Sequence, residues 1–294
     1  MIKKLLTIAL ALIIGTPAFA SVSFNGSNQN LHQSTGFTLG LTNQKQITMS
    51  AWIDIDGTGI SQTKIFGKST QVGGNQTFNF GAQDCGLFDG SSATNTLCLS
   101  MGMDNNPQNT FIVAGMTSST VPLFGVHHVA IVWNNTSGTI SDWTFYINDV
   151  VQTNTSLGTN VGNGYSTSTT IEDLASTIYI GSACGDTCPS EFLAAYITDI
   201  AAWTKALTSG EIATLYNGGI PAPCKRLPRT VEAQNLIMYF PLDDNLTGVV
   251  NSLPLQLGGQ GFYVDQNANS ATWSPDMKCG DGFFASNIKN GGVK

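Results

Sequence analysis

Apolar and polar residues alternate at every second position over much of this chain, which is the pattern of a β-strand with one buried face. In 46–55 the odd-numbered positions from Ile47 to Ile55 are all apolar, whereas the even-numbered positions are polar except for Trp52. Comparable short runs occur at 63–68, 78–83, 97–103, 110–114, 126–133, 143–147 and 177–181. Strands this frequent, separated by Gly, Asn, Ser and Thr, predict an all-β fold, an antiparallel β-sandwich or jelly roll.

One short helix is indicated directly after a long strand pattern at 192–203. Thr208 and Glu211 form a capping box, in which a hydroxyl and a carboxylate satisfy amide groups of the first turn. Leu207 and Ile212 can pack together across this cap as a hydrophobic staple. An Asn-Gly-Gly sequence then ends the helix. We therefore expect a helix of about nine residues after the last main strand.

The N-terminus has the three parts of a secretory signal peptide: a basic start, an apolar run at 5–14 and an Ala-Phe-Ala cleavage signal at 18–20. The rest of the chain has no apolar run near the ~20 residues of a spanning helix. We expect a signal peptide at 1–20, a jelly roll at 21–220 and a C-terminal β appendage at 221–294. The mature protein should be extracellular or periplasmic and not inserted in a membrane.

The charge of the chain argues against nucleic acid as a partner. Without Lys3 and Lys4 of the signal peptide, 10 basic residues stand against 19 acidic ones, a net charge of −9. Nucleic-acid phosphates need a cationic surface, which these residues do not supply. Only 11% of the residues are charged, so Ser, Thr, Asn, Gln and Gly must form much of the surface. Such a surface suits hydroxyl-rich ligands.

Six cysteines in an exported chain predict disulfide bonds. Spacing favours three pairs: Cys85 with Cys98 across a hairpin, Cys184 with Cys188 in a tight loop, and Cys224 with Cys279 holding the tail. Fifteen pairings of six cysteines are possible, so the connectivity stays open. The alternative, a zinc site, is disfavoured because no His lies near a Cys in the sequence.

Several stretches resemble motifs of the laminin G-like jelly rolls in the concanavalin A-like lectin/glucanase superfamily. They are the opening SFNGSNQNL at 23–31, ITMSAWI at 47–53, VHHVA at 126–130 with Val126 in place of the usual Trp, FYIND at 145–149, and the strand and helix at 192–217. The resemblance implies a jelly-roll sandwich whose relatives include lectins and glucanases. The stretch 236–244 resembles a strand that precedes the others in this family, so its place after the helix departs from the usual order.

The resemblance also raises the possibility of a polysaccharide hydrolase. Retaining glycoside hydrolysis needs two carboxyl groups about 5 Å apart. The related hydrolases carry them as Glu-x-Asp-x-x-Glu on one strand, and this motif is absent here. The chain has only four glutamates, which are Glu172, Glu191, Glu211 and Glu232. We therefore expect no enzymatic activity.

A structural calcium ion is the cofactor that the resemblance implies. Sandwiches of this type hold calcium through one carboxylate and several carbonyl oxygens, the hard ligands that this ion prefers. By resemblance the carboxylate is Asp199, and the turn at Asn25 supplies carbonyl oxygen. The alternative for Asp199 is a hydrogen-bonded or exposed side chain. His127 and His128 are adjacent on one strand and point to opposite faces, so they cannot bind one metal together.

Sugar binding requires an aromatic ring that stacks on the sugar, beside amide or carboxylate groups. Trp52 is the first candidate because it alternates away from the apolar face of its strand, and Trp133 and Trp143 are further candidates. The alternative for each is a place in the core. We expect a non-catalytic binding module whose partner is a glycan or a cell-surface protein. The alternatives are a structural or adhesive surface protein without a small ligand and, third, a polysaccharide-degrading enzyme.

Overall fold

The computed structural model describes residues 22–26, 30–32, 38–55, 63–69, 76–83, 96–102, 111–117, 125–157, 166–182, 192–219, 231, 233–240, 242, 249–250, 263–264 and 272–273. The predicted signal peptide at 1–20 lies outside them. Cys98 is described and is disulfide-bonded. The other five cysteines lie outside the described residues, so the three predicted pairings stay predictions. Within the described ranges, no helix is long and apolar enough to span a membrane.

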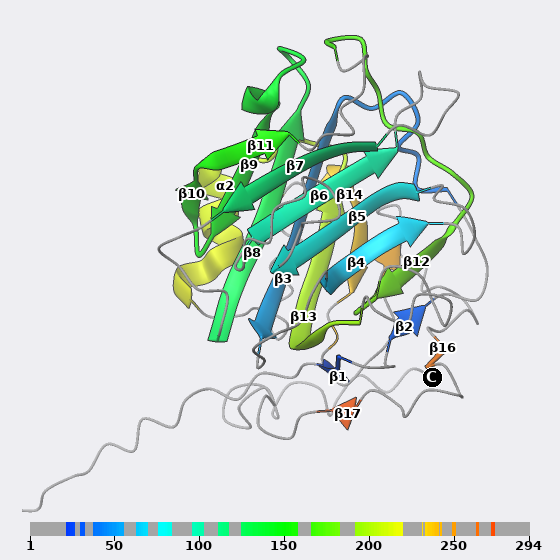
Figure 1. Ribbon diagram of the computed structural model, residues 1–294, viewed down its shortest axis with the longest axis vertical. Coiled ribbons are helices and arrows are strands. Elements are labelled where there is room, and N and C mark those ends of the chain that lie inside the picture. Colours follow the sequence, from blue (N-terminus) through cyan, green and yellow to red (C-terminus); the bar gives the residue numbers. More distant parts are fainter. Residues whose placement is uncertain are drawn as a thin grey trace, which may run out of the picture.

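The described strands form two antiparallel sheets, which confirms the predicted concanavalin A-like jelly-roll sandwich (Figure 1). Sheet A runs in the order β10 (Val150–Gln152), β9 (Trp143–Ile147), β8 (Gly125–Asn134), β3 (Gln46–Ile55), β13 (Ala194–Trp203), β1 (Val22–Asn25) and β17 (Thr272–Trp273). Sheet B runs in the order β11 (Asn154–Leu157), β7 (Phe111–Thr117), β6 (Thr96–Gly102), β5 (Gln76–Gln83), β4 (Thr63–Ser69), β12 (Thr177–Ile180), β2 (Leu31–His32) and β16 (Tyr263–Val264).

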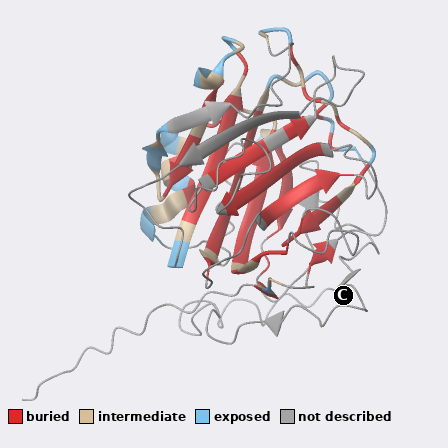
Figure 2. Cartoon of the chain, in the orientation of Figure 1, coloured by how far each residue is buried: buried red, intermediate tan, exposed pale blue. Residues whose placement is uncertain are grey.

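The main core lies between the two sheets, and the strands are buried along most of their length (Figure 2). The alternation predicted for 46–55 is confirmed, because β3 gives its odd-numbered residues to this core. Phe66, Phe78 and Phe80 of sheet B fill the core with edge-to-face ring contacts at centroid distances of 5.6 to 5.9 Å. The face of sheet A that points away from this core is called the outer face below.

The strands after residue 220 join both sheets. β14 (Leu236–Phe240) pairs with β13, and β15 (Val249–Val250) pairs with β14. β17 lies at the end of sheet A beside β1, and β16 lies at the end of sheet B beside β2. The described strands of the C-terminal part therefore share backbone hydrogen bonds with the sandwich.

A second, smaller cluster of buried apolar residues covers part of the outer face. Helix α2 (Ser209–Tyr216) contributes Ile212 and Leu215, which pack with residues of β8, β9, β13 and β14 in the same cluster. Leu207, just before the helix, is also in this cluster, as the predicted staple with Ile212 requires. The Trp203 indole nitrogen donates to the carbonyl oxygen of Val231 at 2.9 Å. A helix this short has little stability of its own, so its packing against the sheet is what stabilises it.

The predicted capping box of α2 is confirmed. Glu211 donates its backbone N–H to the Thr208 hydroxyl at 3.3 Å, and its carboxylate accepts from the Thr208 N–H at 2.7 Å. The helix ends at Asn217, which has a left-handed backbone with φ of 50°. Thr48 of β3 also binds the connection before the helix, since its hydroxyl accepts from the Leu207 N–H at 3.0 Å.

Replacing Thr208 with alanine should lower the free energy of unfolding by about 1 kcal/mol, because the first turn loses its hydroxyl acceptor. Urea denaturation followed by circular dichroism measures this loss. Thr214→Ala is the matched control. Thr214 lies inside the helix and bonds the Gly210 carbonyl at 2.9 Å, so alanine there should be neutral or slightly stabilising. An equal loss in both variants would show that the cap does not hold the helix.

Candidate functional site

The three tryptophans predicted as a sugar platform are buried. Trp133 and Trp143 lie opposite each other on β8 and β9 in the main core, 0% and 2% exposed, with ring centroids 5.9 Å apart. Trp52 is 3% exposed and points to the outer face, as its position in the strand pattern requires. None of the three rings offers an open face to a sugar in this conformation.

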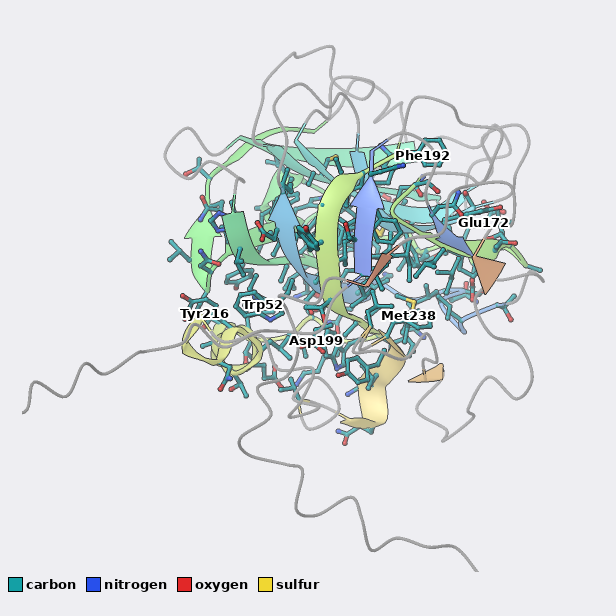
Figure 3. The ribbon with its side chains drawn as sticks, turned by 90° about the horizontal axis from the view of Figure 1, so that it is seen from below. Trp52, Glu172, Phe192, Asp199, Tyr216 and Met238 are labelled. Atoms are coloured by element: carbon teal, nitrogen blue, oxygen red, sulfur yellow. The ribbon has the colours of Figure 1, made fainter. Side chains whose placement is uncertain are left out.

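Trp52 is covered by the last residue of helix α2. The Tyr216 ring stacks on the indole with a centroid distance of 5.9 Å and an interplanar angle of 20° (Figure 3). His128, the cross-strand neighbour of Trp52, completes the cluster at 5.3 Å from the indole and 6.4 Å from Tyr216. Full burial of the imidazole lowers the pKa of His128 to about 3. The ring is therefore neutral at physiological pH and serves packing.

His127 and His128 point to opposite faces of β8, as predicted. His128 is 1% exposed, whereas His127 is half-buried at the start of the strand. The His127 ring contacts the Asn148 side-chain amide, with 2.9 Å between Nδ1 and the amide nitrogen. Asn148 stands in the turn between β9 and β10 and also accepts from the His128 N–H at 3.0 Å. These contacts fix the turn and leave the two histidines apart.

Beyond Tyr216, the outer face carries a line of four cross-strand neighbours. Val126 of β8 lies opposite Asp54 of β3, Asp54 lies opposite Tyr196 of β13, and Tyr196 lies opposite Ser23 of β1. These four residues are called the outer row. Strand alternation directs them away from the core, because their neighbours Ile53, Ile197 and Val22 are in it.

The outer row is partly exposed. Val126 is 43% exposed, and Asp54, Tyr196 and Ser23 are half-buried. Three spacings between adjacent strands separate its ends, which makes it about 14 Å long. It combines an aromatic ring, a carboxylate, a hydroxyl and an apolar side chain. An aromatic platform beside a few hydrogen-bonding groups is what recognition of a sugar requires.

The structure does not bring together the two residues predicted to bind calcium. Asn25 lies opposite Ala194 at the start of β13, and Asp199 is five residues further along that strand, about 17 Å away. Calcium holds its oxygen ligands at about 2.3–2.6 Å, so one ion cannot take both. Among the described residues, no group of three or more His, Cys, Asp or Glu side chains could hold a metal ion. Asp199 and Asn25 do not fit one calcium site, and calcium binding by this chain stays a prediction.

Asp199 instead marks a β-bulge. The register of β13 against β3 shifts between Thr198 and Ala201, so one extra residue stands on β13. Asp199 has a left-handed backbone with φ of 58° at this point, and its side chain is buried. On the other side of β13, the partner changes here from β1 to β14. The bulge therefore lies where two strands meet along one edge of β13.

Two further acidic centres of the described chain serve the fold. Asp173 forms a buried ion pair with Lys68, with 2.9 Å between Nζ and Oδ1. Asp142 is buried, which raises its pKa, but hydrogen bonds from Ser137, Thr136 and Thr139 outweigh this effect and lower the pKa to about 2. Both carboxylates accept backbone N–H groups, and neither belongs to the outer row. The outer row is therefore the candidate site.

Sequence reasoning named none of the four residues of the row as a binding candidate, and it noted only that Val126 stands where the family motif usually has Trp. The alternation of 46–55 does place Asp54 on the side away from the core. Asp54 lies opposite Tyr196 because of the register between β3 and β13, which are about 140 residues apart in the sequence. A local sequence pattern does not determine this register.

Comparison with known proteins agrees with the fold. The family model described as the concanavalin A-like lectin/glucanases superfamily, a laminin G-type model, matches residues 25–213. This match covers 189 of the 294 residues, more than half of the chain. No curated protein matches the chain.

Several solved structures have a similar fold. A heptameric SAP-like pentraxin from Limulus polyphemus is 19% identical with a TM-score of 0.43, covering 67% of this chain and 82% of its own. A protein from Bacteroides ovatus, provisionally named as carbohydrate-binding, is 16% identical with a TM-score of 0.48. The match covers 78% of this chain and 52% of that protein. The NanB sialidase from Streptococcus pneumoniae is 15% identical with a TM-score of 0.43. The match covers 68% of this chain and 28% of the sialidase. This chain thus spans about half of the Bacteroides protein and under a third of the sialidase. The two-sheet sandwich and the matched family model show that the chain belongs to the concanavalin A-like lectin/glucanases superfamily.

Proposed function

We propose that this protein is an exported, non-catalytic carbohydrate-binding module and that it holds its ligand on the outer row. The observation that carries the proposal is the position of Tyr196 between Asp54 and Ser23 on three adjacent strands. The phenol ring offers an apolar face to the C–H side of a sugar, and the carboxylate and hydroxyl beside it accept and donate hydrogen bonds. Membership in a superfamily of lectins and glucanases supports the same class of ligand.

The composition of the row favours binding over hydrolysis. Its one carboxylate belongs to Asp54, whereas glycoside hydrolysis generally uses a pair of carboxyl groups on either side of the bond. Asp54 is suited to accept hydrogen bonds from sugar hydroxyls, and such bonds to a charged acceptor contribute about 1.5–3 kcal/mol. Export follows from the signal-peptide pattern at 1–20.

A glycan array probed with the protein from Ser21 onward tests the proposal. The wild type should bind a defined set of glycans. Tyr196→Ala should weaken binding of those glycans about tenfold, since a ring contact of about 1.4 kcal/mol is lost. Asp54→Asn should weaken it by about ten- to a hundredfold, because a charged acceptor becomes a neutral amide.

Glu172→Gln is the matched control for Asp54→Asn, because it also removes one carboxylate charge. Glu172 is half-buried in the segment before β12, and it lies on the far side of the view from Trp52 and Tyr216 (Figure 3). Binding by this variant should equal that of the wild type. Full affinity in Tyr196→Ala would place the ligand away from the row. A silent array for the wild type would contradict carbohydrate binding and favour a structural or adhesive role.

A further inference from the structure

Helix α2 places a second tyrosine beside the outer row. The row crosses β3 at Asp54, and Trp52 lies two residues away on the same strand, at a distance of about 7 Å. Both residues point to the outer face, because alternate residues of a strand share a face. The Tyr216 ring lies on Trp52, so the last residue of the helix borders the row on this side (Figure 3).

The sheet covers one face of the Tyr216 ring. Trp52 on β3 and His128 on β8 are cross-strand partners in sheet A, and both rings contact the phenol. The indole and the imidazole are 3% and 1% exposed, whereas Tyr216 is half-buried. Because both neighbours belong to the sheet, the exposed part of the phenol is on the side that points away from it.

The position of the Tyr216 ring is fixed before a ligand arrives. Its stack on Trp52 is close to parallel, with 20° between the ring planes. The chain leaves the helix through three left-handed residues, with φ of 50° at Asn217, 66° at Gly218 and 90° at Gly219. A Cβ atom at Gly219 would lie 3.2 Å from the Tyr216 hydroxyl oxygen, so glycine lets the backbone pass close to the phenol. A ring that is already ordered loses little conformational entropy when it binds.

The two tyrosines are spaced for a short chain of sugars. Tyr196 lies opposite Asp54, and Tyr216 lies over Trp52, so their separation combines one spacing between strands with two residues along β3. These two steps place the phenols about 10 Å apart. Tyr216 also lies further from the sheet, because its ring rests on a side chain of β3. One sugar can stack on one of the phenols, whereas linked sugars can stack on both.

We propose that Tyr216 forms a second sugar subsite and that the protein therefore selects oligosaccharides over monosaccharides. This inference rests on the carbohydrate binding proposed above for the outer row. Tyr196 holds one sugar, and Tyr216 holds another sugar of the same chain by stacking on its apolar face. One molecule makes both contacts, so the second contact strengthens binding without a second loss of translational freedom.

A titration with chains of different length, monitored by NMR, tests the inference. The series starts from the monosaccharide unit of a glycan that the array identifies and is lengthened by one sugar at a time. Each compound is added to the protein from Ser21 onward. Chains that reach both phenols should bind about tenfold more tightly than the monosaccharide, because a second ring contact is made. The signals of the Tyr196 ring should shift with every compound, and those of the Tyr216 ring should shift with the longer chains.

Three variants of helix α2 separate binding from support of the fold. Tyr216→Ala should lose the tenfold gain of the longer chains and keep the wild-type affinity for the monosaccharide. Tyr216→Phe should keep the gain, because the ring is retained. Thr214→Ala is the matched control on the exposed side of the same helix and should bind every compound as the wild type does.

The outcomes distinguish this inference from the proposed function. Equal wild-type affinity for all chain lengths, or a length preference that Tyr216→Ala keeps, would overturn the second subsite and leave carbohydrate binding intact. If Tyr216→Ala weakened binding of the monosaccharide and the longer chains alike, the subsite would also be overturned, because Tyr216 would then only support the row. Failure of every glycan to bind the wild type would overturn the proposed function itself and this inference with it.

Discussion

Replacing Lys68 with methionine should lower the free energy of unfolding by about 3–5 kcal/mol. Lys68 and Asp173 are both 0% exposed at their side chains. Burial lowers the pKa of Lys68, and the hydrogen bond and charge of Asp173 raise it again. Methionine keeps much of the side-chain volume but strands the Asp173 carboxylate inside the protein. An uncompensated buried charge is the costly outcome.

The pair also joins segments that are distant in the sequence. Asp173 accepts from the backbone N–H groups of Leu39 and Leu41 at 2.6 and 3.0 Å. Lys68 donates to the Leu174 carbonyl oxygen and lies 3.4 Å from the hydroxyls of Thr77 and Ser176. Strand β4, strand β5 and two connecting segments thus meet at one ammonium–carboxylate contact. Asp173→Ala should cost at least as much as Lys68→Met, because it also removes the acceptor of two buried amides.

Urea denaturation of Lys68→Met and of Lys205→Met compares the loss of a buried ion pair with the loss of a partly exposed one. Lys205 pairs with Glu211 at 2.8 Å, but the two side chains are 29% and 22% exposed, so water screens the pair. The same substitution there should cost below about 1 kcal/mol. Similar losses of unfolding free energy in the two variants would show that burial does not determine how much the Lys68–Asp173 pair contributes to stability.

The features that could be predicted from the sequence are local ones. The helix cap at Thr208 and Glu211 needs only residues within one turn, and the core face of β3 needs only alternation along one strand. The resemblance to the laminin G-like jelly rolls rests on several such local motifs, and the family match over 25–213 confirms it. Short-range rules were therefore enough for the fold class.

The binding site depends on relations that the local patterns do not contain. Alternation places Trp52 correctly on the outer face, but it does not show that Tyr216 of helix α2 covers the indole. The outer row exists because three registers align Val126, Asp54, Tyr196 and Ser23. A shift of one residue in any of them would turn a side chain to the core. The register of β1 and β13 likewise separates Asn25 from Asp199, which the resemblance alone did not indicate.

The fold should lose stability in acid through His128, and His128→Phe should remove that part of the loss. The imidazole is 1% exposed and lies against the Trp52 and Tyr216 rings, and burial lowers its pKa from 6.5 to about 3. Between these two values the unfolded chain binds a proton and the folded protein does not. The free energy of unfolding therefore rises with pH across this window and falls as the solution is acidified.

From pH 7 to pH 4 this single group should lower the free energy of unfolding by about 3 kcal/mol, since each pH unit below 6.5 contributes about 1.4 kcal/mol. Phenylalanine keeps an aromatic ring beside Trp52 and Tyr216 but does not titrate, and the carboxylates are the same in both proteins. Urea denaturation at pH 7 and pH 4 should then show a smaller loss in His128→Phe, by about 3 kcal/mol. In the wild type, the NMR signals of the His128 ring should keep their neutral positions down to about pH 4. Equal acid losses in the two proteins, or a His128 signal that titrates near pH 6.5, would contradict a neutral imidazole sealed beneath helix α2.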